Sequence, residues 1–225
     1  MEPGRRPDHN ESMGHSLWPL YDLRLRTPAL ELRLPTEDEL VRLCQVAKAG
    51  IHDPASMPFE VPWTDKPSPR FEREFLQHHW AARSQWTPQR WMLGLAVFQD
   101  GDPIGFQDIG ADNFPVLREV VTGSWLGQAF QGHGYGKQMR AAALHLAFAE
   151  LGAGLARSGA MAGNPASLAV SRALGYQDNG TSRAAPRGEP VDRIDLRLTR
   201  QRWQQHRHCE VSVEGLASCR DMFGG

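Results

Sequence analysis

The sequence predicts one mixed α/β (α+β) domain, because segments with the two-residue period of strands alternate with segments that have the period of helices. Leucines occupy alternate positions over 30–34, and apolar residues alternate with charged ones again over 191–200. The segment 37–49 instead places its leucines and alanine at helical spacing. We expect the order β-α-α-β-β-β-α-β-α-β-β, without an internal repeat.

The first predicted helix, over 37–49, is marked at both ends. Thr36 and Glu39 have the spacing of a capping box, and Gly50 follows as a stop signal. The next segment, 51–69, is dense in proline but also carries three large apolar residues, Met57, Phe59 and Trp63. A loop surrounded by solvent does not need such side chains, so we expect this one to fold back. We expect the three side chains to line a substrate pocket, and simple anchoring of the loop is the alternative.

The rest of the chain predicts a helix, a hairpin and further strands and helices. Ser68-Pro69 opens a helix over 71–86, in which Trp80 is expected to face inward. Asp100-Gly101 predicts the turn of a hairpin over 91–109. Strands and helices then alternate, with strands over 119–130, 153–163 and 191–200 and helices after 136, after 164 and after 200.

Composition limits the classes of partner and compartment. The chain has 25 basic and 26 acidic residues, which gives no electrostatic reason to expect nucleic acid or an anionic membrane as a partner. No apolar run approaches the roughly 20 residues of a membrane span. The three cysteines are odd in number and widely spaced, as in reduced thiols. We therefore expect a cytoplasmic protein, with a flexible arm over 1–16 and a single domain with a C-terminal extension over 17–225.

The glycine-rich stretch 131–136, which follows a strand and opens a helix, is the strongest local signal. A dinucleotide fingerprint beginning at Gly132 fails, because Lys137 stands where a glycine is required. A P-loop fails because Gln131 and Gln138 replace its glycine and its serine or threonine. The remaining reading is a nest of backbone N–H groups suited to a pyrophosphate. An ordinary glycine-rich turn is the alternative.

Two motifs identify a resemblance. The Gln-x-x-Gly-x-Gly pattern of 131–136 resembles the acyl-CoA pyrophosphate loop of the GNAT superfamily of N-acyltransferases. Asn164, Ser167, Val170 and Gly175-Tyr176 resemble the signature of the branch that acetylates ribosomal-protein N-termini. Three further segments resemble actinobacterial GNAT succinyltransferases, and these are 51–64, 123–136 and 210–224.

The resemblance implies a GNAT fold, with a mixed, mostly antiparallel sheet flanked by helices and two splayed central strands that receive the pantetheine of acyl-CoA. It implies no metal. The residues that it implies in binding CoA are Trp125, Leu126, Gly127, Gln131, Gly132, His133, Gly134, Tyr135, Gly136, Lys137, Asn164 and Ser167. A solvated role remains open for Lys137, and Asn164 is equally suited to capping a helix.

The implied chemistry is direct attack of an amine on the thioester, which needs a base, an oxyanion donor and protonation of the thiolate. Here the chain departs from the family. Val121 stands where family members often have a Glu that acts as the general base, and Ser171 stands where many have a Tyr that protonates the sulfur. Glu119 could act through water, although a surface carboxylate at a strand end is the alternative. His52 is another catalytic candidate, and the remaining ones are Asp53, Asp108 and Asp112.

The sequence thus predicts an acyl-CoA-dependent N-acyltransferase that moves an acetyl or succinyl group to a small-molecule or protein amine. A succinyl pocket should offer a cation or hydroxyl to the distal carboxylate, and the sequence does not identify that group. The alternative is a non-catalytic acyl-CoA-binding or sensing module. The tract 206–209 lacks a second ligand pair for a metal. Aromatic side chains in the C-terminal segment leave self-association into a homo-oligomer as an open alternative.

Overall fold

The computed structural model describes residues 17–207 and 209–224, so the arm expected over 1–16 lies outside the described residues. The strands are β1 (Arg24–Arg26), β2 (Glu31–Arg33), β3 (Arg90–Gln99), β4 (Asp102–Asp112), β5 (Glu119–Leu126), β6 (Leu155–Met161), β7 (Gln177–Ala184), β8 (Val191–Thr199) and β9 (Ser212–Glu214). The helices are α1 (Glu37–Ala49), α2 (Arg70–Ser84), α3 (Phe114–Leu117), α4 (Tyr135–His145), α5 (Pro165–Ala173) and α6 (Arg200–Gln205).

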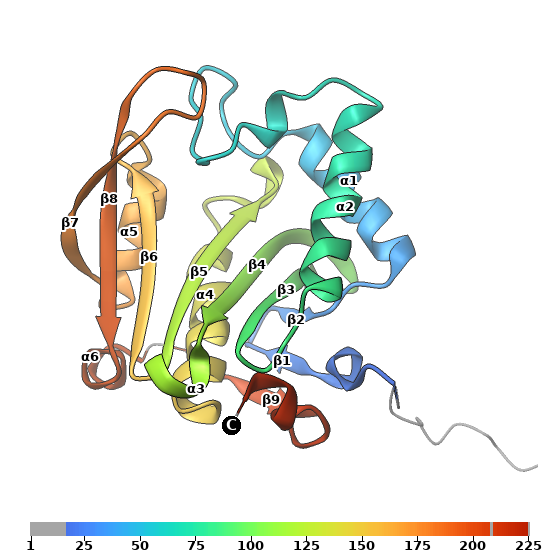
Figure 1. Cartoon of the computed structure of the whole chain (residues 1–225). Coiled ribbons are helices and arrows are strands. Elements are labelled where there is room, and N and C mark those ends of the chain that lie inside the picture. The colour runs from blue at the N-terminus through green and yellow to red at the C-terminus, as the bar shows by residue number, and fades with distance from the viewer. Residues whose placement is uncertain (1–16, 208, 225) are drawn as a thin grey trace, which may run out of the picture.

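The described strands form one sheet in the order β7-β8-β6-β5-β4-β3-β2-β1-β9 (Figure 1). β5 and β6 run parallel, whereas every other neighbouring pair is antiparallel. This confirms the mixed, mostly antiparallel sheet. Two strands have no counterpart in the predicted order: β1, which forms a hairpin with β2, and β9, which the C-terminal segment adds beside β1.

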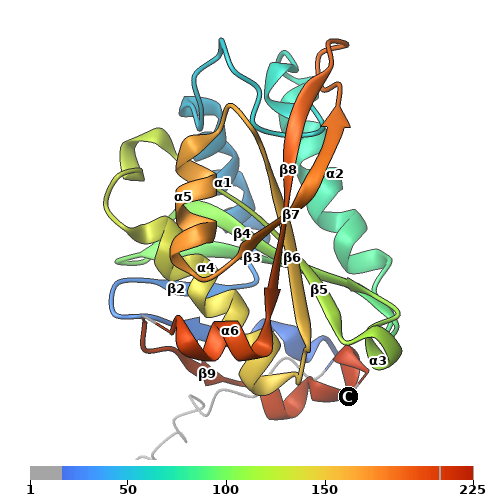
Figure 2. The same cartoon turned by 90° about the vertical axis from the view of Figure 1, so that its left-hand side faces the viewer.

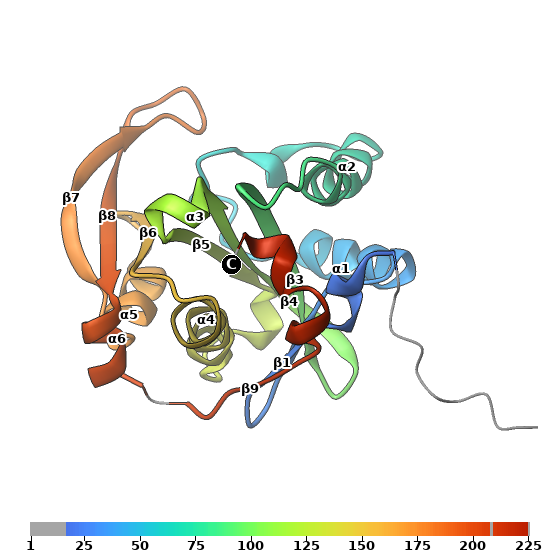
Figure 3. The same ribbon diagram turned by 60° about the horizontal axis from the view of Figure 1, so that its bottom comes forward.

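Helices cover both faces of the sheet. α4 and α5 lie on one side and α2 on the other (Figure 2). Between the sheet and α1 and α2 lies an aromatic core that includes Phe71, Phe75 and Phe106. A larger core, in which aliphatic side chains predominate, lies under α4, which runs along the opposite face of the sheet from α2 (Figure 3). In the described part of the chain no helix is both long and apolar enough to cross a membrane.

Local signals of the sequence set several boundaries as expected. Thr36 and Glu39 form the reciprocal capping box at the start of α1. Asp100 and Gly101 have φ of 51° and 88°, the left-handed pair required by the tight turn between β3 and β4. The short helix α3, which lies between the predicted hairpin over 91–109 and the predicted strand over 119–130, has Pro115 in its first turn.

The inward position predicted for Trp80 is wrong. Its side chain is 46% exposed, and its indole N–H donates to Glu37 on α1. The preceding residue, His79, takes the inward position instead, with ring centroids 4.7 Å from both Phe75 and Phe106. Burial lowers the pKa of His79 to about 3, so its ring is neutral at physiological pH and packs as an aromatic side chain.

Candidate active site

The two parallel strands at the centre of the sheet part from each other. β5 and β6 pair from Glu119–Leu155 to Val121–Arg157, but both strands continue beyond that point. At the first unpaired position the Ser158 hydroxyl donates to the Thr122 carbonyl at 3.1 Å, in place of a backbone bond. A gap therefore opens between the C-terminal halves of the strands, as expected for a sheet that receives an extended ligand.

Backbone direction shows which groups of β5 face this gap. The Gly127 N–H donates to the carbonyl of Ile104 in β4, so the amide groups of alternate residues from Gly127 backward point toward β4. The Thr122 carbonyl, in the other set, points toward β6. The N–H groups of Ser124 and Leu126 belong to this second set and therefore face the gap.

Gly127 has a packing role at the end of β5. Its N–H is bonded to β4, and a Cβ at this position would lie 2.8 Å from a methyl group of Val46 on α1. The missing side chain therefore allows α1 to approach the end of β5. The backbone N–H groups that face the gap are those of Leu126 and Ser124, and the sequence reasoning did not single out Ser124.

The glycine-rich loop lies at the mouth of the gap and starts α4. Gly132 and Gly134 have φ of 81° and 83°, a left-handed conformation that side chains rarely adopt. Among the described residues, no acceptor meets the backbone N–H groups from Gly132 to Gly136, and the helix has no side-chain cap. Open N–H groups at a helix N-terminus favour an anion.

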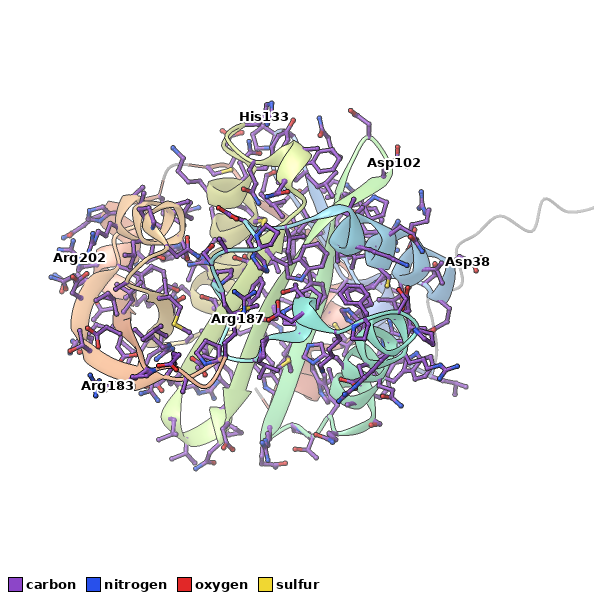
Figure 4. The ribbon with its side chains drawn as sticks, turned by 90° about the horizontal axis from the view of Figure 1, so that it is seen from above. Asp38, Asp102, His133, Arg183, Arg187 and Arg202 are labelled. Carbon is purple, nitrogen blue, oxygen red and sulfur yellow. The ribbon has the colours of Figure 1, made fainter. Side chains whose placement is uncertain are left out.

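Side chains of the loop divide between supporting and exposed positions. The Gln131 amide donates to the carbonyls of Ile51 and Leu126, at 2.9 and 3.0 Å, and ties the loop to the end of β5. His133 and Tyr135 stack with centroids 5.7 Å apart, and His133 lies at the outer edge of the molecule (Figure 4). Lys137 is exposed in the first turn of α4.

On the far side of the gap, the Asn164 side chain accepts the N–H of Ser167 at 3.1 Å and caps α5. About one turn after Ser167, the buried Ser171 hydroxyl donates to the carbonyl of Ser167. The same hydroxyl accepts a hydrogen bond from Arg140 of α4 at 2.9 Å. Ser171 is thus held in a polar network, and the structure does not bring it to Glu119 or His52.

Sequence reasoning missed Arg140, which is 4% exposed and lies between α4 and the sheet. Its guanidinium also donates to Ser124 of β5 at 2.7 Å and to Ser158 of β6 at 3.4 Å. The available signal was a single arginine among the apolar residues Met139, Ala142, Ala143 and Leu144.

On the opposite face of the sheet, Asp108 of β4 lies next to Gly123, across β5 from the gap. It is on the same face as Phe106, and its carboxylate accepts the N–H of Gly123 at 2.5 Å. Burial raises the pKa of Asp108, because the surroundings disfavour its charged form. A carboxylate with a raised pKa suits a general base.

Glu119 lies farther away. It is about 13 Å along β5 from Gly123, at roughly 3.3 Å per residue, and its carboxylate pairs with Arg157 at 2.6 Å. Val121, between them on this face, is 47% exposed and carries no titratable group. The geometry therefore favours Asp108 over Glu119 as a proton acceptor.

The cover loop, residues 51–66, places an aromatic layer next to β5. Trp63 contacts Trp125 with centroids 6.0 Å apart, and Phe59 contacts Trp63 at 5.4 Å. Both ring nitrogens of His52 are bonded within this loop, to Thr64 and to a backbone carbonyl, at 2.8 Å each. His52 thus holds the loop together. Met57 is half-buried in the same loop.

Two ion pairs hold the cover loop to the β7–β8 hairpin, which lies across the molecule from α2. Arg187 pairs with Asp65 at 2.7 Å and also donates to the carbonyl of Pro54. Arg193 pairs with Glu60 at 2.8 Å. Figure 4 shows Arg187 near the middle of the molecule when it is seen from above. The hairpin and loop together border the face that carries Asp108.

No group of three or more metal-ligating side chains occurs within residues 17–207 and 209–224. One hollow lies beside Trp18 and His79 and another beside His145 and Trp203, and neither touches the glycine loop or the gap.

A split between two parallel strands, with an open glycine loop and a helix N-terminus at its mouth, is the architecture expected for an acyl-CoA-dependent transferase. The chain belongs to the GNAT acetyltransferase family. The family model described as "Acetyltransferase (GNAT) domain" matches residues 29–177, about two thirds of the chain.

Solved structures show the same fold. RimJ of Mycobacterium smegmatis, in complex with CoA-disulfide, is 18% identical, covers 90% of this chain and 95% of its own, and has a TM-score of 0.68. A Vibrio cholerae protein described as a ribosomal-protein-serine acetyltransferase is 22% identical, covers 78% and 97%, and has a TM-score of 0.62. RimL, a ribosomal L7/L12 α-N-protein acetyltransferase in complex with coenzyme A, is 20% identical, covers 77% and 95%, and has a TM-score of 0.61.

Proposed function

We propose that this protein transfers an acyl group from coenzyme A to an amine, with the pantetheine arm in the gap between β5 and β6. The observation that carries this proposal is the coincidence of three features: the strands part at Val121, the N–H groups of Ser124 and Leu126 face the opening, and the unpaired amides of Gly132–Gly136 lie at its mouth. A pyrophosphate at the loop and an amide-bearing arm in the gap would satisfy both sets of donors.

The acceptor amine approaches from the face that carries Asp108, under the cover loop. Its nitrogen attacks the thioester carbonyl while the N–H of Ser124, which lies farther from the glycine loop than that of Leu126, stabilises the developing oxyanion. Asp108 takes the proton from the amine, directly or through one water. The C–S bond then breaks, giving an amide and the thiolate of CoA, which takes up a proton to leave as the free thiol.

The acceptor class is a further part of the proposal. The aromatic side chains of Phe59, Trp63 and Trp125 flank the approach, with ion pairs to the β7–β8 hairpin at its border. Protein acetyltransferases are among the similar structures, so a protein N-terminus is one acceptor to test beside small amines and lysine.

The test measures release of CoA thiol from acetyl-CoA and succinyl-CoA with a panel of small amines, lysine and N-terminal peptides. The proposed function predicts amine-dependent thiol release with at least one acceptor. Tight binding of CoA without turnover on any amine would instead support the non-catalytic acyl-CoA-binding module. Absence of binding to CoA and to both thioesters would contradict the proposal as a whole.

A further inference from the structure

Arg140 is a buried cation whose hydrogen-bond partners are all neutral. It donates to the hydroxyls of Ser171, Ser124 and Ser158, and its Nε has no partner. Within the described part of the chain no carboxylate forms an ion pair with it. Burying a charge without a counter-charge costs several kcal/mol, on the order of magnitude found for single ions in proteins.

Two titratable groups influence Arg140 from a distance. Asp108 lies on the opposite face of the sheet, where its carboxylate is bonded to Gly123. Tyr176 shares its hydroxyl with Thr122 at 3.2 Å and is neutral at physiological pH. Neither neutralises the guanidinium by contact, and burial lowers the pKa of Arg140 accordingly. An arginine nevertheless stays protonated in proteins, so Arg140 carries a positive charge that has no counter-ion in contact among the described residues and can bind an anion.

The position of Arg140 decides which anion can reach it. The three serine partners come from β5, β6 and α5, so they border the gap from both sides. Arg140 is five residues after the start of α4, about 7.5 Å along the helix axis, and it faces the sheet. A pyrophosphate at the glycine loop therefore lies at the other end of this stretch of helix. An anion beside Arg140 has to be carried by the thioester end of the ligand.

We propose that Arg140 selects acyl-CoA thioesters whose acyl chain ends in a carboxylate, as in the succinyl class. This inference rests on the proposed function, because it needs pantetheine in the gap. The planar guanidinium can bind a carboxylate through two parallel hydrogen bonds, and its partly accessible contact is the one to Ser124. The hydroxyls of Ser124 and Ser158 can reorient as additional donors to the same group.

A different role for the same charge would be to stabilise the thiolate or oxyanion that every acyl chain produces. The two roles differ in one observable. A role in selection changes the affinity for charged relative to uncharged acyl chains in the ground state. A role in the transition state changes the rate with all acyl chains equally and leaves those affinities unchanged.

The experiment compares succinyl-CoA with butyryl-CoA, whose chain has the same number of carbons but no carboxylate. Dissociation constants of both, and of CoA, are measured on the full-length chain without an acceptor. We expect succinyl-CoA to bind roughly 10–100-fold more tightly than butyryl-CoA, the effect of a charge-assisted hydrogen-bonded pair. Equal affinities in the unaltered protein would overturn the inference without any variant.

Arg140→Met keeps roughly the length of the side chain and removes the charge. The ratio of the affinity for succinyl-CoA to that for butyryl-CoA should therefore fall to about one or below, while CoA still binds. Arg172→Met is the matched control, since Arg172 lies on α5 but pairs at the surface with Asp178. It should keep the preference of the unaltered protein. A preference that survives Arg140→Met contradicts the inference. If the unaltered protein binds neither CoA nor any of the thioesters, the proposed function is contradicted instead.

Discussion

Replacing Asp108 by Asn tests the assignment of the base with little change in shape. The asparagine carbonyl can still accept the N–H of Gly123, so the local path of β5 should persist. The variant cannot accept a proton from the amine. Removing a general base costs roughly 10²–10⁴-fold in rate, so kcat/KM with the best amine of the panel should fall by about 100-fold or more.

Stability should move differently from activity. Burial raises the pKa of Asp108, so its charged form destabilises the folded protein. A group whose folded pKa is raised contributes most stability below its unfolded pKa, and this is lost as pH rises through the folded value. At pH 7 the free energy of unfolding of the Asn variant should therefore equal that of the unaltered protein or exceed it by up to about 1 kcal/mol.

The assay is thiol release as a function of pH, with urea denaturation on the same samples. For the unaltered protein, kcat/KM should decline as pH falls through the raised pKa of Asp108, and the variant should lack this decline. Asp112→Asn, at the exposed end of the same strand, serves as the control and should keep full activity. Retention of more than a tenth of kcat/KM by Asp108→Asn would refute the assignment.

Three other predictions concern the frame around the site. Hydrogen bonding to Arg33 lowers the pKa of Glu39 to about 2, so Glu39 stabilises the fold above its unfolded pKa and this is lost as pH falls from about 4.5 to 2. Glu39→Gln should therefore cost roughly 1–2 kcal/mol in urea denaturation at pH 7, and a cost that persists at pH 2 would contradict this origin. Gly127→Ala should lower Tm, since overpacking against Val46 costs about 1–3 kcal/mol. An unchanged Tm would show that α1 can move to make room for the added methyl group without a loss of stability. Arg187→Ala should change stability by less than about 1 kcal/mol but speed proteolysis within the cover loop, and unchanged cleavage would exclude a fastening role.

Signals that depend on a few neighbouring residues predicted their structures correctly. The capping box of Thr36 and Glu39 and the turn at Asp100-Gly101 each follow from local hydrogen bonding or backbone preference. The start of α4 at the glycine loop follows in the same way, because Gly132 and Gly134 adopt left-handed backbone. These features therefore need no knowledge of the rest of the fold.

Other features depend on which segments meet in three dimensions. His79 lies in the aromatic core in place of Trp80 because its side of α2 packs against β3 and against Phe106 of β4, and these strands are distant from the helix in the sequence. The polar surroundings of Arg140 come from three elements that are distant in the sequence. Asp108 lies next to Gly123 only because β4 pairs with β5 in one particular register.

If the loop of Gly132–Gly136 binds the pyrophosphate of CoA, a negative charge introduced into this loop should weaken the affinity for acetyl-CoA measured by titration calorimetry. Gly134→Glu adds a negative charge where a Cβ has no neighbour within 4 Å, at a φ of 83°. Gly152→Glu adds the same charge at a similarly open position with a φ of 75°, after the π-helical turn that extends α4 at its other end. We predict a loss of affinity of about 100-fold or more for Gly134→Glu and less than about twofold for Gly152→Glu. Unchanged binding by Gly134→Glu, or equal losses in both variants, would contradict this role of the loop.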